Sequence, residues 1–509
     1  MDQKILENLY VTGTYSKLLE EIKKLSYKDP TSKLSDIEKA ICLSYHSRGL
    51  IRLGKIADAE KTLQEFNNKL NECSNNFSLS SLIYYTSVLN LLNLQGNIEK
   101  SLKIGLEIES LINIEKNVFS ENEEIFSFWS AFLYYLIGMA YYYQFKHDLA
   151  NQYLKISLNV NKNNLYIKGK SLYLISYIKI EKGEFFKGDF SFEESLNIFR
   201  EINNRQGQAW AILWQGQFLL QKGNLKSAKN MFLEALNLFS SIKEPQGFHI
   251  TNSLIGSLYF HQGDIDSAEK LLEKSFDSLV EIADPQMLTY CVIPLLLLYA
   301  ETGQRLKATN CIDLYQNKCE KSSSSRIEIN RLIAKAIYLK SSTRLIDKGE
   351  AQKIFLNLLN DPNRKVMNPY VHTDKSFTFF IIVSLIELSL EEFKISEDNL
   401  ILEEVKQLID NHIQKEGSKE SLEFIELELI GAKFLIIEGK LGEALNIMEK
   451  TKEIAVNNDY HYLEDKINKE IEKIDREFKK TIDSTVKERI QRMQLEVYLQ
   501  EAKKIQGII

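Results

Sequence analysis

The sequence is poor in the residues that interrupt regular structure. Its 509 residues include 6 prolines and 22 glycines, about 1% and 4% of the chain, where average usage is about 5% and 7%. Length alone suggests about three domains, at roughly 100–200 residues each. Separate packed domains joined by linkers would need more turn residues than this. The composition therefore argues against that division and indicates long regular elements.

Cysteine pairs, excess basic charge and long apolar runs are also scarce. The five cysteines are scattered and form no Cys-x-x-Cys pair, which indicates reduced thiols in a cytoplasmic protein. Lys and Arg total 64 against 70 Asp and Glu, without the basic stripe of a nucleic-acid binder. The most apolar runs, 291–300 and 377–386, are shorter than the roughly 20 residues that span a bilayer. We therefore expect a soluble, cytoplasmic protein with no nucleic-acid or membrane partner.

Motifs of common enzyme classes are missing as well. The sequence contains no phosphate-binding P-loop, no GxGxxG, no HExxH and no GxSxG. Its seven histidines include no pair spaced by three or four residues, as a metal site on one helix would require. These absences predict no catalytic residue, no metal site, no cofactor and no enzymatic activity.

An internal repeat of 40 residues organises the middle of the chain. Four glycines recur without a gap at this spacing, and a large apolar residue follows each nine positions later: Gly183 and Phe192, Gly223 and Phe232, Gly263 and Leu272, and Gly303 and Ile312. Apolar residues at helical spacing flank each glycine, as in 211–221 and 226–239. Because glycine tolerates a left-handed conformation, it suits a tight turn between two helices. The repeated unit is therefore a helix, a turn and a second helix.

The junctions between these units also match one another. Three short segments align at the same spacing of 40: Arg205-Gln206-Gly207, Pro245-Gln246-Gly247 and Pro285-Gln286-Met287. Weaker copies of the unit lie upstream, with turn glycines at 13, 54 and 96, and downstream, at Gly439. In the copy around Gly138, Phe145 takes the place of the turn glycine. The Ser35-x-x-Glu38 pair predicts the start of a helix through a capping box.

One unit carries a resemblance to a known family. Gly216, Gly223, Ala228, Phe232 and Ala235 fill the spacing of small and large residues typical of a tetratricopeptide repeat (TPR). The 40-residue length is similar to the longer variant in kinesin light chains and in the solenoid domains of some bacterial regulators. The resemblance implies an all-α fold, namely a right-handed solenoid of antiparallel helix pairs with about eight units and a long C-terminal helix.

We predict four segments along the chain. Residues 1–360 form the solenoid, most regular at about 130–320, and an irregular loop with two prolines follows at 361–374. Residues 375–458 form further helical hairpins, including a TPR-like unit at 420–455, and 459–509 form one or two amphipathic helices. This last segment either caps the solenoid or docks on a partner or a second copy of the chain. Both interpretations stay open, as does self-association through this segment.

The resemblance also implies where a partner would bind. In the family the first helices of the pairs line the concave face, and the matching positions here are rich in aromatic residues, the usual anchors of protein interfaces. The candidate residues are Phe132, Tyr135, Met139, Tyr142, Tyr143, Lys170, Tyr173, Tyr177, Trp210, Gln217 and Phe260. The alternative is that these side chains fill space between the helices. Because Lys170 is the only basic residue among them, we expect an extended, partly apolar and weakly charged ligand.

Two functions are compatible with this interpretation. The first is a non-catalytic scaffold that binds a peptide or protein segment in the concave, aromatic-lined groove. The second is a regulatory or sensor subunit, in which the solenoid responds to a ligand or partner and controls an effector on another chain.

Overall fold

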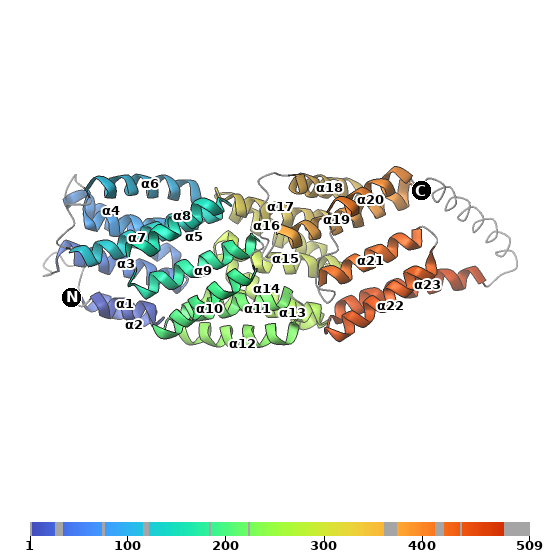
Figure 1. The fold of residues 1–509 in the computed structure, drawn as a ribbon, viewed down its shortest axis with the longest axis horizontal. Helices are drawn as coiled ribbons and strands as arrows, with labels where there is room; N and C mark the ends of the chain where they lie inside the picture. The colour runs from blue at the N-terminus through green and yellow to red at the C-terminus, as the bar shows by residue number, and fades with distance from the viewer. Residues whose placement is uncertain are drawn as a thin grey trace. The chain divides into compact units, whose positions relative to one another are not determined.

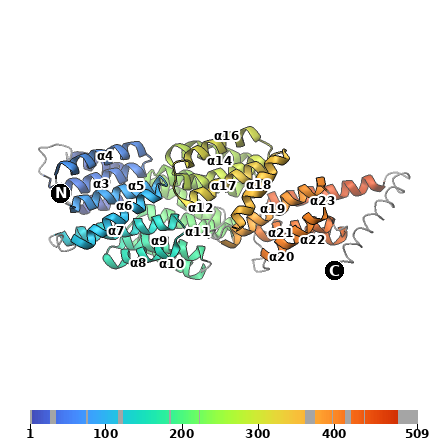
Figure 2. The same cartoon turned by 90° about the horizontal axis from the view of Figure 1, so that it is seen from above.

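The computed structural model describes residues 3–25, 34–73, 77–115, 122–182, 185–221, 224–360, 374–396, 398–412, 422–437 and 440–482. Within these ranges there are 23 α-helices and no β-strand. Successive helices run as antiparallel pairs placed side by side (Figures 1 and 2). The predicted fold class, an all-α, right-handed solenoid of antiparallel helix pairs, is confirmed.

The described part of residues 3–360 forms nine helix pairs, close to the eight predicted. They are α1 (Gln3–Val11) with α2 (Tyr15–Lys24), α3 (Asp36–Arg52) with α4 (Ile56–Cys73), α5 (Leu79–Leu94) with α6 (Ile98–Glu115), α7 (Glu123–Tyr143) with α8 (His147–Val160), α9 (Leu165–Glu181) with α10 (Phe185–Glu201), α11 (Arg205–Gln221) with α12 (Leu225–Ile242), α13 (Pro245–His261) with α14 (Ile265–Ile282), α15 (Pro285–Glu301) with α16 (Arg305–Cys319), and α17 (Ser325–Lys340) with α18 (Leu345–Asn360). The remaining helices are α19 (Asp374–Ser396), α20 (Asn399–His412), α21 (Leu422–Ile437), α22 (Leu441–Asn457) and α23 (His461–Ile482).

The chain divides into two compact units. The first comprises Met1–Gln217, Ala228–Gly256 and Glu269–Phe377, and the second comprises Phe218–Ser227, Ser257–Ala268 and Thr378–Ile509. Residues 361–373 of the predicted loop lie outside the described residues. The four segment limits given above therefore stay predictions.

The turns within the pairs have the backbone that the repeat pattern predicts. Gly13, Gly54, Gly96, Gly263 and Gly303 all have positive φ, between 70° and 78°, a region that costs other residues energy. Phe145, predicted to replace a turn glycine, has a φ of 58°, so its side chain must compensate for an unfavourable backbone. The predicted glycine turns at 183, 223 and 439 lie outside the described residues.

Local side chains explain the helix starts and the small residues of the repeat. The predicted capping box before α3 is present, because Ser35 N donates to Glu38 at 2.9 Å and Glu38 N donates to the Ser35 hydroxyl at 3.3 Å. A Cβ atom on Gly216 would lie 2.8 Å from the ring of Phe232. Close approach of α11 and α12 therefore requires glycine at this position.

Turns of the first unit touch helix junctions that lie far along the chain. A Cβ atom on Gly13 would lie 2.7 Å from Cγ2 of Ile242, and one on Gly54 would lie 3.3 Å from Cγ2 of Ile282. The Gly96 carbonyl accepts a hydrogen bond from the hydroxyl of Ser322, 226 residues away, at 3.1 Å. We call these three pairs the layer contacts. A solenoid in which each unit touches only its neighbours would have none of them.

Helix α7 is more apolar than the sequence analysis recognised. It is 21 residues long, its best 18-residue window has a mean hydropathy of 1.2, and it is the one described helix that is long and apolar enough to cross a membrane. In this fold 72% of that window is buried inside the protein. This burial explains the apolar character of α7, because α7 is a core helix of the fold.

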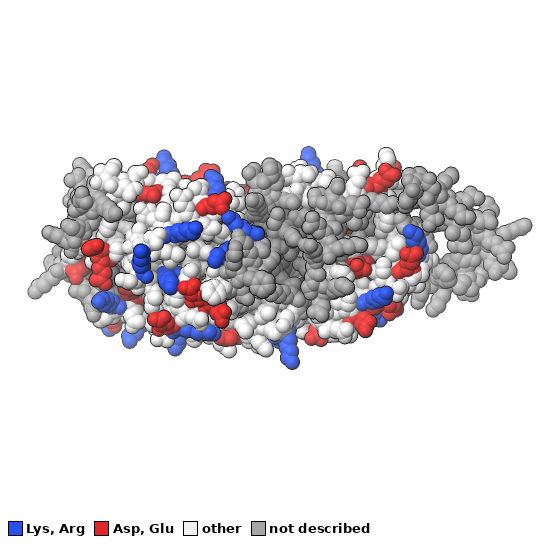
Figure 3. Space-filling model, in the orientation of Figure 1, with Lys and Arg blue, Asp and Glu red and all other residues white. Residues whose placement is uncertain are grey.

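The surface charges are mixed. On the face drawn in Figure 3, several described Lys and Arg side chains gather left of centre, and Asp and Glu side chains lie mainly around them and along the lower edge.

The C-terminal helix α23 packs within the second unit. Its residues Leu463 and Ile467 are 2% and 0% exposed, and the ring of Tyr462 lies 4.5 Å from that of Phe260. These positions belong to the predicted amphipathic stripe, and they are buried within the second unit. The predicted continuation at 483–506, with the possible second helix start at Thr485, lies outside the described residues.

Candidate ligand-binding pocket

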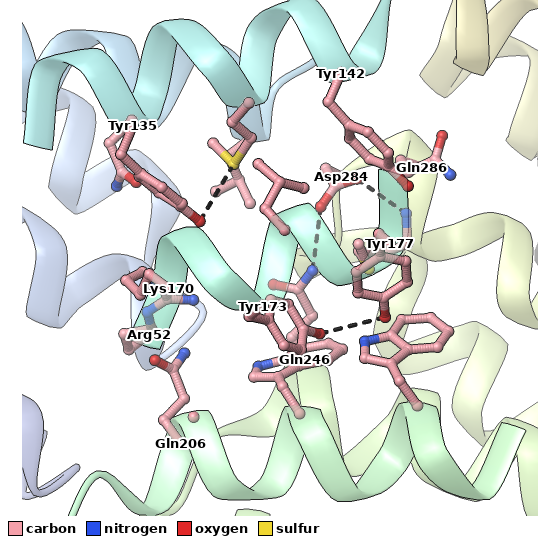
Figure 4. Close-up of a pocket in the computed structure, with 18 of the residues that line it drawn as sticks. Arg52, Tyr135, Tyr142, Lys170, Tyr173, Tyr177, Gln206, Gln246, Asp284 and Gln286 are labelled. Carbon is pink, nitrogen blue, oxygen red and sulfur yellow. Dashed lines mark hydrogen bonds between the residues drawn. The ribbon is translucent and has the colours of Figure 1, made fainter. Parts of the chain in front are cut away.

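A pocket of about 200 Å³ opens in the first unit (Figure 4). Seven helices supply its walls, namely α3, α5, α7, α9, α11, α13 and α15, together with Asn204 and Asp284 just before α11 and α15. Each of these is the first helix of its pair, and Phe199 is the one lining residue from a second helix. The pocket therefore lies on the face where the resemblance to the repeat family places a binding groove.

Eight of the eleven residues predicted for the groove line this pocket. They are Tyr135, Met139, Tyr142, Tyr143, Lys170, Tyr173, Tyr177 and Trp210.

The other three predicted residues lie elsewhere. Phe132 is 1% exposed and packs parallel to Tyr135, with ring centroids 6.1 Å apart, so it supports the wall from behind. Gln217 is 1% exposed and is not among the lining residues. Phe260 belongs to the second unit, where it contacts Tyr462.

The aromatic wall is held by contacts among its own rings. Tyr177 lies edge-on to Trp214 at 5.4 Å between centroids, and Trp214 lies 4.9 Å from Tyr290. The hydroxyls of Tyr173 and Tyr177 are 3.3 Å apart. Such ring pairs add stability beyond the area they bury. The rings thus fill space between helices, as the alternative interpretation expected, and also form a wall that exists before any ligand arrives.

One end of the pocket is basic (Figure 4). The Lys170 ammonium lies 5.5 Å from the ring centroids of both Tyr135 and Tyr166, and burial lowers the pKa of Lys170. The Arg52 guanidinium faces the side-chain amide of Gln206. In the amide orientation that gives both the oxygen and the nitrogen of Gln206 suitable partners, the Gln206 oxygen accepts from Arg52 Nε at 2.9 Å and from Arg52 Nη1 at 2.8 Å. This end therefore presents two cations to the pocket.

A third cation, Arg48, lies behind this end. Its side chain is 1% exposed and its Cζ lies 4.1 Å from the ring centroid of Tyr10 and 4.6 Å from that of Phe132. The Tyr10 hydroxyl accepts from Arg52 Nε at 3.3 Å. Burial by itself raises the pKa of Tyr10, but the charges of Arg52 and Arg48 outweigh it and bring that pKa to about 7.

The other end of the pocket is acidic and rich in amides. Asp284 caps α15, since its carboxylate accepts from Met287 N at 2.9 Å and from Gln246 Nε2 at 3.2 Å. Burial raises the pKa of Asp284 to about 6, although these hydrogen bonds lower it. Gln286, next to Asp284 in the lining, accepts from Asn330 Nδ2 at 3.3 Å.

Sequence reasoning missed these polar residues, although one pattern pointed to them. Gln206, Gln246 and Gln286 occupy the same place in the three matching junction segments, and all three line the pocket. A polar residue repeated at one face position was the available signal. Arg52 carried no such signal, because it lies in a weak copy whose register the repeat does not fix.

A buried ion cluster adjoins the acidic end. Glu181 accepts from Arg326 Nη2 at 3.1 Å and from the Tyr142 hydroxyl at 2.6 Å, and His147 Nε2 lies 2.6 Å from the same carboxylate. Burial raises the pKa of Glu181, but the charge of Arg326 together with the contacts to His147 and Tyr142 outweighs it, so the pKa is lowered overall. The cluster fastens α17 to α7, α8 and α9, and through Tyr142 it reaches the pocket wall.

The chemistry of the pocket is that of a binding site. In the described ranges no three His, Cys, Asp or Glu side chains are grouped so that they could hold a metal ion. What converges instead is an aromatic wall, three amides from successive helix pairs, and opposite charges at the two ends. Pockets of this composition orient a ligand through a few polar groups on a mostly apolar surface.

Comparison with known proteins places the fold. No family model matches the chain, and no curated protein matches its sequence. The crystal structure of a Rap protein complexed with Competence and Sporulation Factor has a TM-score of 0.50 and 14% identity, and covers 74% of this chain and 98% of that chain.

Two further structures are less similar. NprR in complex with its cognate peptide NprX has a TM-score of 0.43 and 17% identity, over 70% of this chain and 98% of that one. The human IFIT1 dimer with m7Gppp-AAAA has a TM-score of 0.42 and 16% identity, over 88% of each chain. At these values only the Rap structure carries weight, and it supports the fold of a helical-repeat solenoid.

Proposed function

We propose that the chain is a non-catalytic scaffold that binds a short, extended peptide segment in this pocket. The observation that carries the proposal is the convergence of seven first helices on one cavity with aromatic walls. A volume of about 200 Å³ suits a few side chains of an extended segment better than a folded domain. The amides of Gln206, Gln246 and Gln286, which line the pocket from three successive helix pairs, can donate to or accept from an extended backbone.

Similarity to the Rap structure supports the proposal at the level of fold. That protein was crystallised with a bound factor, so a solenoid of this type is compatible with a ligand. We also propose that the protein is cytoplasmic and has no nucleic-acid or membrane partner; the burial of α7 inside the protein supports the part that concerns the membrane.

The proposal is tested by filling the pocket. Met139 lines it and is half-buried, so Met139→Trp should occlude it. Leu233 on α12 is 43% exposed and does not line it, so Leu233→Trp adds the same ring at an unrelated position. A random hexapeptide library is passed over each full-length protein, and retained peptides are identified by mass spectrometry.

The wild-type protein and Leu233→Trp should retain the same peptides, and Met139→Trp should lose them while keeping its helical circular dichroism. A wild-type protein that retains no peptide, or a Met139→Trp variant that retains the same ones, would count against peptide binding in this pocket.

A regulatory or sensor subunit is the second candidate function. The pocket walls come from both α3–α9 and α11–α15, and the layer contacts join the turns within the first three helix pairs to the ends of α12, α14 and α16. A ligand touching both sets of helices would favour one spacing between them. We expect a retained peptide to shift the small-angle scattering profile, and an unchanged profile at saturation would remove this alternative.

We also propose that residues 459–509 cap the solenoid and that self-association, if it occurs, uses residues beyond α23. The burial of Leu463 and Ile467 supports the capping role, because these side chains already pack inside the second unit and are not exposed to a partner. Truncation after residue 482 should then leave the melting temperature nearly unchanged and abolish any dimer seen in sedimentation. A large loss of stability would show that the omitted segment belongs to the core of the second unit.

A further inference from the structure

We infer that Tyr10 is an ionised phenolate, the internal counter-ion of Arg48 and Arg52, and that it holds Arg52 in place at the basic end of the pocket. Tyr10 lies on α1 and is not among the lining residues, whereas Arg52 is. Tyr10 is therefore a positioning residue that reaches a ligand only through Arg52. The inference concerns the free protein, so it holds or fails independently of peptide binding.

The side chain of Tyr10 is enclosed by the two guanidinium groups. It is 3% exposed, and its hydroxyl accepts from Arg52 Nε at 3.3 Å. The Arg48 Cζ lies 4.1 Å from the centroid of its ring. Because a phenolate oxygen is a stronger acceptor than a neutral hydroxyl, and burial strengthens its attraction to a cation, this arrangement favours the ionised form. Three further tyrosine rings lie around it, namely Tyr15, Tyr45 and Tyr166.

Arg48 shows why a negative charge is needed here. Its side chain is 1% exposed, and its Nη2 donates to the Tyr166 hydroxyl at 3.3 Å. Its Nε and Nη1 have no hydrogen-bond acceptor among the described residues. A guanidinium keeps its charge when it is buried, so it requires an anion nearby. A phenolate at Tyr10 supplies a full charge, whereas a neutral ring attracts a cation only through its face.

The charges around this site balance when Tyr10 is ionised. Three cations and two carboxyl groups surround it: Arg48, Arg52, Lys170, Glu7 and Glu244. Glu244 lies 3.9 Å from Arg52, and the charge of Lys170 acts on both Glu244 and Tyr10. With the phenolate, three negative charges face three positive ones. A neutral Tyr10 would leave one positive charge uncompensated in a site removed from water.

The pKa shifts of the neighbouring phenols agree with this assignment. Burial by itself raises the pKa of Tyr10, but the surrounding cations, Arg52 first among them, outweigh burial and bring the pKa to about 7. An ionised Tyr10 repels a second phenolate at Tyr166, which faces Arg48 as well, so only one of the two ionises. Burial raises the pKa of the three surrounding phenols, Tyr15, Tyr45 and Tyr166.

The charge of the basic end therefore changes near neutral pH. Above a pH of about 7 the phenolate makes the surroundings of Arg52 neutral overall, which suits the weakly charged ligand expected from the sequence. Below that pH the site gains one positive charge, and Arg52 loses its nearest anionic partner.

The test is a pH titration of the full-length protein followed by near-ultraviolet absorbance, where a phenolate absorbs and a neutral phenol does not. Wild-type protein should form one phenolate per chain with a midpoint near pH 7, well below the value of about 10 for ordinary tyrosines. This step should be absent from Tyr10→Phe and present in Tyr166→Phe, the matched control. A wild-type protein without the step, or its loss in Tyr166→Phe with retention in Tyr10→Phe, overturns the inference.

A second pair of variants connects the ionisation to Arg52. Arg52→Gln removes the cation and should raise the midpoint by about 1–3 pH units, whereas Arg52→Lys should keep it close to neutral. Arg331 pairs with Glu328 at the surface, so Arg331→Gln is the control and should leave the midpoint unchanged. An unchanged midpoint in folded Arg52→Gln would overturn the role of Arg52.

Stability gives an independent measurement, because the folded pKa of Tyr10 lies below its unfolded value of 10.0. Above a pH of about 7 the unfolded chain binds a proton that the folded chain lacks, so the folded state gains stability as pH rises. The unfolding constant of the wild type, relative to Tyr10→Phe, should fall by a factor approaching about tenfold per pH unit up to pH ~9. A ratio that stays constant over this range would show a neutral, purely structural hydroxyl and would overturn the inference.

Discussion

Arg326 shows how a single buried charge joins distant parts of this chain. Its side chain is 1% exposed, and its guanidinium contacts the carboxylate of Glu181 and the ring faces of Tyr142 and Phe145, at 4.2 and 4.3 Å. Phe145 adopts a positive φ, so this contact helps to hold an unfavourable backbone. A charge excluded from water in this way depends on all of its partners being present.

Arg326→Met is expected to lower the free energy of unfolding by about 3–5 kcal/mol, because it leaves Glu181 buried without its main counter-charge. Arg331 is the control on the same helix: it pairs with Glu328 at 2.7 Å, but at the surface. Arg331→Met should cost less than about 1 kcal/mol. Urea unfolding followed by circular dichroism measures both, and similar losses would mean that the cluster is not a special source of stability.

Asp284 should make stability depend on pH in an unusual direction. Its folded pKa of about 6 lies above the unfolded value of 3.8, so the folded state holds the proton more tightly. The free energy of unfolding should therefore fall as pH rises from about 4 to about 6, and level off above. Relative to Asp284→Asn, which can still cap α15, the fall should approach about 3 kcal/mol. Parallel curves for the two proteins would contradict the raised pKa.

At the scale of the elements, the turns within the helix pairs were the features that the sequence predicted best. The glycine spacing predicted left-handed turns, and even the substitution of Phe145 was predicted at the right place. The left-handed residues at the junctions, Asn203 and Lys243 with φ of 51° and 54°, were not predicted. Neither Asn203 nor Lys243 is a glycine, and it was the recurrence of glycine that predicted the other left-handed turns.

Lys243→Gly should therefore stabilise the fold, by up to about 1 kcal/mol, because glycine adopts this conformation without steric cost. Lys243 is exposed, so little packing is lost. Glu234 is exposed within α12, and Glu234→Gly should instead destabilise by about 0.5–1 kcal/mol through loss of helix propensity. The opposite signs are measured by thermal unfolding, and destabilisation by both would argue against a left-handed Lys243.

At the scale of the whole molecule, the layer contacts could not be predicted from the sequence. Repeat spacing specifies which helices are neighbours in sequence, but contact between Gly13 and Ile242 depends on small rotations that accumulate over several pairs. The meeting of Arg52 with Gln206 depends on the same accumulation. This explains why eight residues that line the pocket, six of them aromatic, were predicted from local pattern. Arg52 and the charge difference between the two ends of the pocket were not.

Alanine substitutions at two glycines can distinguish the energetic cost of losing a layer contact from the cost of backbone strain. Gly13 and Gly303 have similar φ, 78° and 70°, but a Cβ atom on Gly13 would meet Ile242 whereas one on Gly303 would meet nothing within 4 Å. Gly303→Ala should cost about 1 kcal/mol from the backbone alone. Gly13→Ala should cost at least about 1 kcal/mol more, and Ile242→Ala in the same protein should recover part of that difference. Equal costs for the two glycine variants would argue against the contact.

The layer contacts also set an order of events during synthesis. At roughly 5–20 residues per second, the 226 residues between Gly96 and Ser322 take about 10–45 s to be translated. During that interval the turn at Gly96 has been synthesised while its partner is still unmade, and the same holds for Gly13 until Ile242 is made and for Gly54 until Ile282 is made. The N-terminal pairs must therefore persist with an uncovered surface, and it is during this period that they are most accessible to chaperones and proteases.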